Sequence, residues 1–178
     1  RIRRIDAETS SLPFPDNSFD FVFSDQVMEH VKNHQRAFAE IKRVMKPDAV
    51  SLHIFPSKLK PVEAHVFVPL GGVMQSRWWL RIWAGLGIRN SFQTRKSATE
   101  VVDLNSKYLS ERTNYLSRRE LMQAISASFQ QVIWAEKHMI KHSYGRARRL
   151  YPLVRLTPVV AKIYSALYAR VIFLRNSN

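Results

Sequence analysis

The sequence predicts an α/β fold organised around one strand–helix–strand unit between residues 6 and 56. Phenylalanines alternate through Phe19–Phe23 after a turn rich in Pro, Asn and Ser, which is typical of a buried strand. An amphipathic helix pattern follows and ends before Pro47, and the nearly continuous apolar run Val50–Phe55 predicts a second strand. Ligands of open α/β sheets bind outside the carboxyl ends of the strands. We therefore expect the polar tip Ser24–Gln26 to face a ligand.

The helix of this unit is predicted to begin at Asn33, which can cap it, and to end near Met45 because Pro47 stops it. Residues 1–5 indicate the end of an earlier strand. Apolar residues recur at helical spacing along one face: Ala37, Phe38, Ile41, Val44 and Met45.

The regular strand and helix pattern breaks between residues 58 and 114, where Pro and Gly residues are frequent. A short aromatic helix with basic residues is predicted at Arg77–Trp83. Insertions of this kind inside a domain often form lids or binding elements. We expect residues 58–114 to be an insertion that covers the substrate, placed after the central strand.

Regular elements return at Tyr115. Ser117 and Glu120 form a capping box at the start of a helix, and Val132–Ala135 is strand-like. Thr157 and Pro158 predict the start of another helix, and Val171–Leu174 a last strand. Residues 1–57 are thus expected to be the C-terminal part of a ligand-binding core, and residues 115–178 to complete that core with a basic tail.

The composition excludes some classes of protein and favours others. The chain has 178 residues and no Cys, so disulfides and thiolate chemistry are excluded. Its net charge of +14 lies entirely beyond residue 57, and such a field favours anionic partners. No segment approaches the roughly 20 apolar residues of a transmembrane helix. The chain begins at Arg1 beside strand-like sequence, which suggests a fragment of a longer protein.

Several of these segments, in order, resemble the class I S-adenosylmethionine-dependent methyltransferases. The closest subgroup is the small-molecule type (type 11) that includes ubiquinone and menaquinone biosynthesis enzymes. The resemblance implies a Rossmann-like, mostly parallel sheet. It is carried by five ordered segments: Asp6–Glu8, Leu12–Asp20, Met28–Val31, Arg43–Pro47 and Tyr115–Leu121.

By this resemblance the cofactor is S-adenosylmethionine. Asp6 would accept a hydrogen bond from the adenine amino group and Ala7 would contact the ring, while Ser24 and Asp25 would border the methionine part. The family's glycine-rich loop and ribose-binding acid are absent, so only half of the cofactor site is represented. Asp48 replaces the first glycine of the family's Lys-Pro-Gly-Gly turn, and Asp tolerates the left-handed geometry expected there.

Two histidines are candidates for a catalytic base. His65 lies in the insertion, which is expected to approach the reacting methyl group, and His30 lies just past the polar tip. Packing or surface roles remain open for both. His53 is expected to be a core histidine. His34, His138 and His142 show no metal-ligand pattern with carboxylates, so we predict no metal site.

The acceptor is expected to be a small molecule, or a surface-glycan or lipid-linked compound, and to be methylated on oxygen. The segment from Pro56 to Gln93 resembles methyltransferases of surface-glycan pathways, so Glu63, Trp78 and Trp79 are candidate substrate residues. The tryptophans can equally be core, or contact lipid beside Arg77 and Arg81.

A rival interpretation is a non-catalytic, methyltransferase-like module that binds an anionic membrane or another polyanion. The C-terminal arginines favour such a partner, but no aromatic-interleaved pattern accompanies them, so a nucleic-acid partner is not expected. We expect a cytoplasmic protein, with peripheral contact at the inner membrane face as the alternative.

Overall fold

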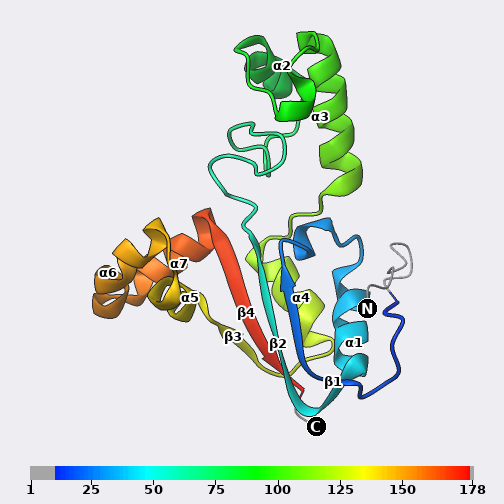
Figure 1. The fold of residues 1–178 in the computed structure, drawn as a ribbon, viewed down its shortest axis with the longest axis vertical. Helices are drawn as coiled ribbons and strands as arrows, with labels where there is room; N and C mark the ends of the chain where they lie inside the picture. Colours follow the sequence, from blue (N-terminus) through cyan, green and yellow to red (C-terminus); the bar gives the residue numbers. More distant parts are fainter. Residues whose placement is uncertain (1–10, 177–178) are drawn as a thin grey trace.

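The computed structural model describes residues 11–176, which form a four-stranded sheet with flanking helices (Figure 1). The order in the sheet is β1-β2-β4-β3. The predicted strand at residues 1–5, Asp6 and Ala7 lie outside the described residues. The bounds of the strands are β1 Phe19–Asp25, β2 Met45–Pro56, β3 Val132–Trp134 and β4 Ala169–Arg175.

The α/β class is confirmed, and the sheet is mixed. β1 pairs in parallel with β2, whereas β4 is antiparallel to both β2 and β3. The expectation of a mostly parallel sheet therefore holds for strand direction, since β1, β2 and β3 run the same way, but two of the three pairings are antiparallel. The reason is that β4 begins where β2 ends, with Ala169 opposite Pro56, and runs back along it.

The strand–helix–strand unit forms as predicted. The Asn33 side chain caps helix α1 (His34–Val44) by accepting a hydrogen bond from the Arg36 backbone N–H. β2 starts earlier than Val50 because Phe19 already pairs with Met45, across an irregular register. Asp48 has φ of 63°, so its expected left-handed geometry is confirmed.

Helix α4 (Arg118–Ser126) packs with α1 against the sheet, and its predicted capping box of Ser117 and Glu120 is confirmed. The sheet, α1 and α4 enclose the larger of two apolar clusters, here called the sheet core. Its buried members are Met28, Phe38, Ile41, Met45, Ala49, Phe55, Leu121, Ile125, Phe129, Ile172 and Leu174.

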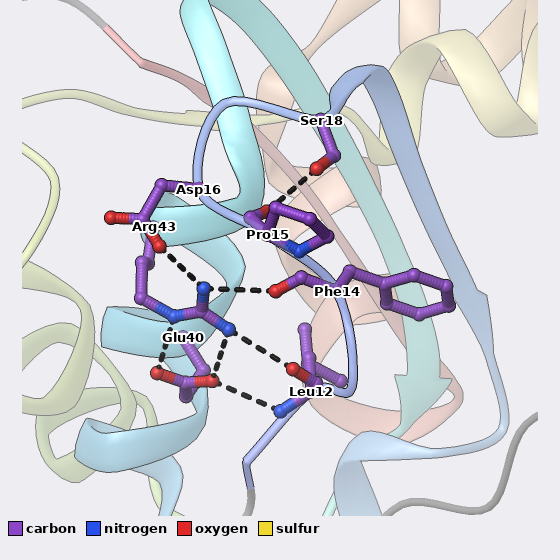
Figure 2. A network of polar contacts seen from close by, with 7 residues as sticks. All are labelled: Leu12, Phe14, Pro15, Asp16, Ser18, Glu40 and Arg43. Atoms are coloured by element: carbon purple, nitrogen blue, oxygen red, sulfur yellow. Dashed lines mark hydrogen bonds and ion pairs between the residues drawn. The ribbon is translucent and has the colours of Figure 1, made fainter.

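A single arginine of α1 holds the loop that precedes β1 (Figure 2). The guanidinium of Arg43 donates two hydrogen bonds to Glu40 and one to Asp16, at 2.6–2.9 Å. It also donates to the carbonyls of Leu12 and Phe14, at 3.0 and 2.9 Å. Five bonds equal the full set of guanidinium N–H donors. The Pro-rich loop is thereby fixed on α1, although it has no regular structure.

The insertion forms its own helical unit beyond one end of the sheet (Figure 1). The predicted aromatic helix is confirmed as α2 (Arg77–Gly85), and η2 (Ser91–Gln93) leads to the long α3 (Ala98–Arg112), which the sequence analysis missed. The buried members of this second cluster, the insertion core, are Val66, Val68, Leu80, Ala84, Val101, Val102 and Leu109.

The chain then forms a C-terminal helical lobe before β4 (Figure 1). α7 begins at Pro158 with Thr157 as its cap, as predicted, while α5 and α6 were not anticipated. Among residues 11–176, no helix combines the length and the apolar character needed to cross a membrane. The elements of the lobe are α5 Glu136–His142, η3 Arg146–Leu150, α6 Tyr151–Leu156 and α7 Pro158–Leu167.

Candidate active site

A cleft of about 1550 Å³ opens at the carboxyl end of β1, between that strand, η1 (Met28–His30) and the C-terminal end of α3. Ser24 of the polar tip lies on its wall. Asp25 is exposed next to it, and its Oδ1 accepts a hydrogen bond from Gln26 Nε2 at 3.4 Å. The cleft is lined by side chains of β1, of η1 and the residue before it, and of α3, among them Val22, Phe23, Val27, His30, Tyr108, Glu111 and Arg112.

Ser24 is joined to the central strand by a hydrogen bond. Its Oγ lies 2.7 Å from Nδ1 of His53, which is fully buried on β2. Burial lowers the pKa of His53 to about 4, so the ring is neutral at pH 7. The expected core position of His53 is confirmed, and its contact with Ser24 also places it beside the cleft.

The two candidate bases, His30 and His65, come together although 35 positions separate them in the chain. Their rings meet edge to face with centroids 4.8 Å apart. His30 Nδ1 lies 2.7 Å from the carbonyl oxygen of Arg112, and His65 Nδ1 lies 2.8 Å from Glu63 Oε1. A carbonyl or carboxylate oxygen only accepts, so we assign the proton of each neutral ring to Nδ1. Each Nε2 then carries a free lone pair.

Glu63 is buried, and donors surround its carboxylate. Besides His65 Nδ1, it accepts from the backbone N–H groups of His65 and Val66, both at 2.7 Å, and from the Tyr115 hydroxyl at 2.5 Å. Burial alone would raise the pKa of Glu63, but these hydrogen bonds outweigh it and lower the pKa to about 2. The hydrogen bond to ionised Glu63 in turn raises the pKa of His65. Glu63 thus orients His65 and increases its basicity.

Glu29 lies beside these histidines and was not among the site residues predicted from the sequence. Its side chain is buried, and neither carboxylate oxygen has a hydrogen-bond partner among residues 11–176. Burial raises its pKa. His30 Nε2 lies 3.9 Å from Glu29 Oε1, and one ligand atom each from Glu29, His30 and His65 lie within 4.8 Å of one another. The available signal was an acid next to a histidine within the otherwise apolar segment Met28–Val31.

The tryptophans occupy two different environments. Trp79 packs against the insertion core, and its Nε1 donates to the Pro69 carbonyl at 2.8 Å. Trp78 is 58% exposed and lies against Trp79 with ring centroids 5.6 Å apart. Of these two rings, Trp78 is the one that is mainly exposed to solvent.

Residues 1–52 match the family model described as a methyltransferase domain. The resemblance inferred from the ordered sequence segments is therefore confirmed at the level of the family. The match covers less than a third of the chain.

Curated relatives match the chain over short stretches. An uncharacterised methyltransferase of Schizosaccharomyces pombe is 53% identical over 36 residues, which are 20% of this chain and 13% of that protein. A sterol 24-C-methyltransferase of Gibberella zeae is 32% identical over 50 residues, which are 28% of this chain and again 13% of that protein. The matches thus span only a small part of these relatives.

Solved structures resemble the chain over most of its length at low identity. An S-adenosylmethionine-dependent methyltransferase from Mesorhizobium loti shares 13% identity, with a TM-score of 0.48, over 97% of this chain and 68% of its own. A phosphoethanolamine N-methyltransferase of Haemonchus contortus, solved with phosphomonomethylethanolamine and S-adenosylhomocysteine, shares 16% identity with a TM-score of 0.42. That match covers 96% of this chain and 35% of the other.

Proposed function

We propose that this chain belongs to an S-adenosylmethionine-dependent methyltransferase that acts on a small-molecule acceptor. The observation that supports this proposal best is the position of the cleft. It opens at the carboxyl end of β1, within the segment that matches a methyltransferase domain, and two histidines with free Nε2 atoms meet at its border.

The described residues fit one part of the cofactor. Ser24 offers a hydroxyl at the strand end, and the apolar side chains of Val22 and Val27 line the same wall, which suits the mixed polar and apolar surface of an adenosylmethionine. Ser24 and Asp25 are the candidates for its methionine part, and Asp6 and Ala7 for its adenine. The cofactor supplies an activated methyl group on a sulfonium.

The chain's own residues would align the acceptor and remove its proton. Methyl transfer from a sulfonium depends mainly on in-line positioning and exclusion of water. His65 is the favoured base for an acceptor hydroxyl, since Glu63 holds its Nδ1–H and leaves Nε2 free. His30 would share the proton or orient the acceptor. O-methylation is therefore the reaction proposed for this site.

A surface-glycan or lipid-linked compound is the acceptor class proposed for the insertion. Trp78 is mainly exposed on α2, and the ring of Trp79 meets it edge to face. Glu63 acts on the acceptor only through His65, because its carboxylate already receives four hydrogen bonds.

The C-terminal lobe supports peripheral contact with an anionic membrane as a property of the same enzyme. Leu153, Leu156, Val159 and Ile163 are all more than half exposed on the short helices α6 and α7. Exposed basic residues precede these apolar residues or lie among them in the sequence, a combination suited to anionic headgroups and the acyl boundary. These basic residues are Arg146, Arg148, Arg149, Arg155 and Lys162.

Calorimetric titration of the purified full-length protein with S-adenosylmethionine tests the methyltransferase proposal. We expect saturable binding that is weakened by Ser24→Val. The matched control is Ser126→Ala, which changes an exposed serine on α4 and should leave binding unchanged. No binding by a protein with an intact circular dichroism spectrum would overturn the proposal. Salt-sensitive binding to phosphatidylglycerol vesicles in that case would favour the non-catalytic module.

A further inference from the structure

We propose that Glu29, His30 and His65 bind one divalent transition-metal ion, and that Zn²⁺ fits their donors best. Two imidazoles and one carboxylate are a ligand set of catalytic zinc sites, which keep a further position open for water or substrate. One ligand atom from each residue already lies within 4.8 Å of the other two. Donors held at about 2.0–2.2 Å from a tetrahedral ion lie roughly 3.4 Å apart, so no pair of ligand atoms has to close by more than about 1.4 Å on binding.

The two imidazoles are oriented as metal-binding histidines are. A ligating histidine usually donates its other ring N–H to a carboxylate or a backbone carbonyl, which fixes the tautomer and leaves a basic nitrogen for the ion. His65 has the carboxylate of Glu63 in this role, and His30 has the carbonyl of Arg112. In both rings the nitrogen left for the ion is Nε2.

The carboxylate of Glu29 supplies the independent observation. It is 1% exposed, and neither of its oxygens has a hydrogen-bond partner among the described residues. Buried charges are usually paired or coordinate a metal, because an isolated carboxylate is expensive to desolvate. His30 Nε2 lies 3.9 Å from Glu29 Oε1, too far for a hydrogen bond but suitable for a shared ion.

The site joins two parts of the molecule. Glu29 and His30 belong to η1 beside the sheet core, whereas His65 belongs to the insertion. His30 also lines the cleft, so an ion held here has a side open to small molecules. An ion would therefore fasten the insertion to the core at the mouth of the cleft.

Zinc titration of the metal-free, full-length protein tests the site. We expect one Zn²⁺ per chain by calorimetry, with at least tenfold weaker binding in Glu29→Gln and in His65→Asn. The control is the double variant His138→Asn/His142→Asn. These exposed residues, four positions apart on α5, can hold zinc adventitiously, and we expect their replacement to leave the tight site intact. Tight binding that is lost only in the α5 variant would overturn the proposal, as would no binding at all.

X-ray absorption of the zinc-loaded wild type keeps the test independent of variant folding. We expect two imidazole ligands and oxygen donors at about 2.0–2.1 Å. A spectrum of water ligands alone would refute the site. These experiments measure metal binding and not methyl transfer. A failure to bind zinc would therefore overturn the metal site without bearing on the proposed methyltransferase function. One consequence rests on the proposed function: a bound ion would lower the pKa of an acceptor hydroxyl, so that its proton could pass to solvent water, while His65 would hold the ion through Nε2 instead of acting as the base.

Discussion

The sheet core and the insertion core differ in how they relate to the sequence. In the sheet core, α1 and the strands beside it follow directly from local patterns, and Asn33 and Pro47 mark the limits of the helix. In the insertion, α2 and α3 pack on each other around a cluster that has no member in common with the first. Yet His30 comes from one side and His65 from the other. The comparison indicates that the candidate site depends on how two separately packed units meet.

Core truncations test whether the two units are separate, and they should have the largest effects. Phe38→Ala in the sheet core is expected to cost about 3–5 kcal/mol, and Leu109→Ala in the insertion core about 2–5 kcal/mol, since both side chains are buried. Hydrogen exchange should show that the Leu109 variant exposes the amides of α2 and α3 while β2 and β4 stay protected. Equal loss of protection in β2 would mean that the two cores unfold together.

The buried His53 should make the sheet core sensitive to acid. Its folded pKa of about 4 lies below the unfolded value of 6.5, so the unfolded chain binds more protons between these values. Stability therefore falls as pH drops from about 6.5 to 4, by roughly 3 kcal/mol. Urea unfolding across this range should show a flatter dependence for His53→Gln.

Some acid sensitivity should remain in that variant, because burial also lowers the pKa of His34. The exposed His142→Gln is the control and should leave the slope unchanged. A wild-type stability that does not change between pH 6.5 and pH 4 would contradict the neutral, buried state of His53.

Glu63→Gln tests the contact that prepares His65 on the insertion side. If methyl transfer uses His65, kcat should fall about 10–100-fold, because a glutamine cannot hold the Nδ1–H as a carboxylate does. Glu63 raises the pKa of His65, so the acid limb of the pH–rate profile should move to lower pH in the variant. Asp103→Asn, at an exposed ion pair with Arg77, is the control. A fall in kcat without a shift in the acid limb of the pH–rate profile would indicate that Glu63 has a purely structural role.

The smallest effect is expected at Asp48, near the start of β2. Its φ of 63° is tolerated by Asp but is costly for a β-branched residue, so Asp48→Val should destabilise the protein by about 1–2 kcal/mol. Asp48→Gly should stay close to wild type in thermal unfolding, since glycine adopts this geometry freely. A valine variant as stable as the glycine variant would show that the backbone here can rearrange.

Local signals predicted the elements whose ends are marked by caps, prolines or turns. Asn33, Ser117 and Thr157 cap helices as expected, because such bonds form within three residues. The same signal at Ser97 and Glu100 was overlooked, and α3 was missed with it. The direction of β4 was not predictable in this way, since it is set by pairing with β2 more than 100 residues earlier.

The candidate site was predicted only in part for the same reason. His30 and His65 were singled out one by one, but their contact depends on how α3 and the insertion dock on η1. The prediction of no metal site considered other histidines, and the structure instead gathers Glu29 with these two. The burial of Glu29 and the donors around Glu63 are long-range properties that spacing does not reveal.

The position of β4 also has a consequence for biosynthesis. β3 is joined to the rest of the sheet only through β4, which is the last element of the described chain. During translation, the edges of β2 and β3 that pair with β4 therefore stay unpaired until residues 169–175 have left the ribosome. Unpaired strand edges are prone to aggregation. The synthesis of β4 thus determines when these edges of β2 and β3 are protected from pairing with other chains.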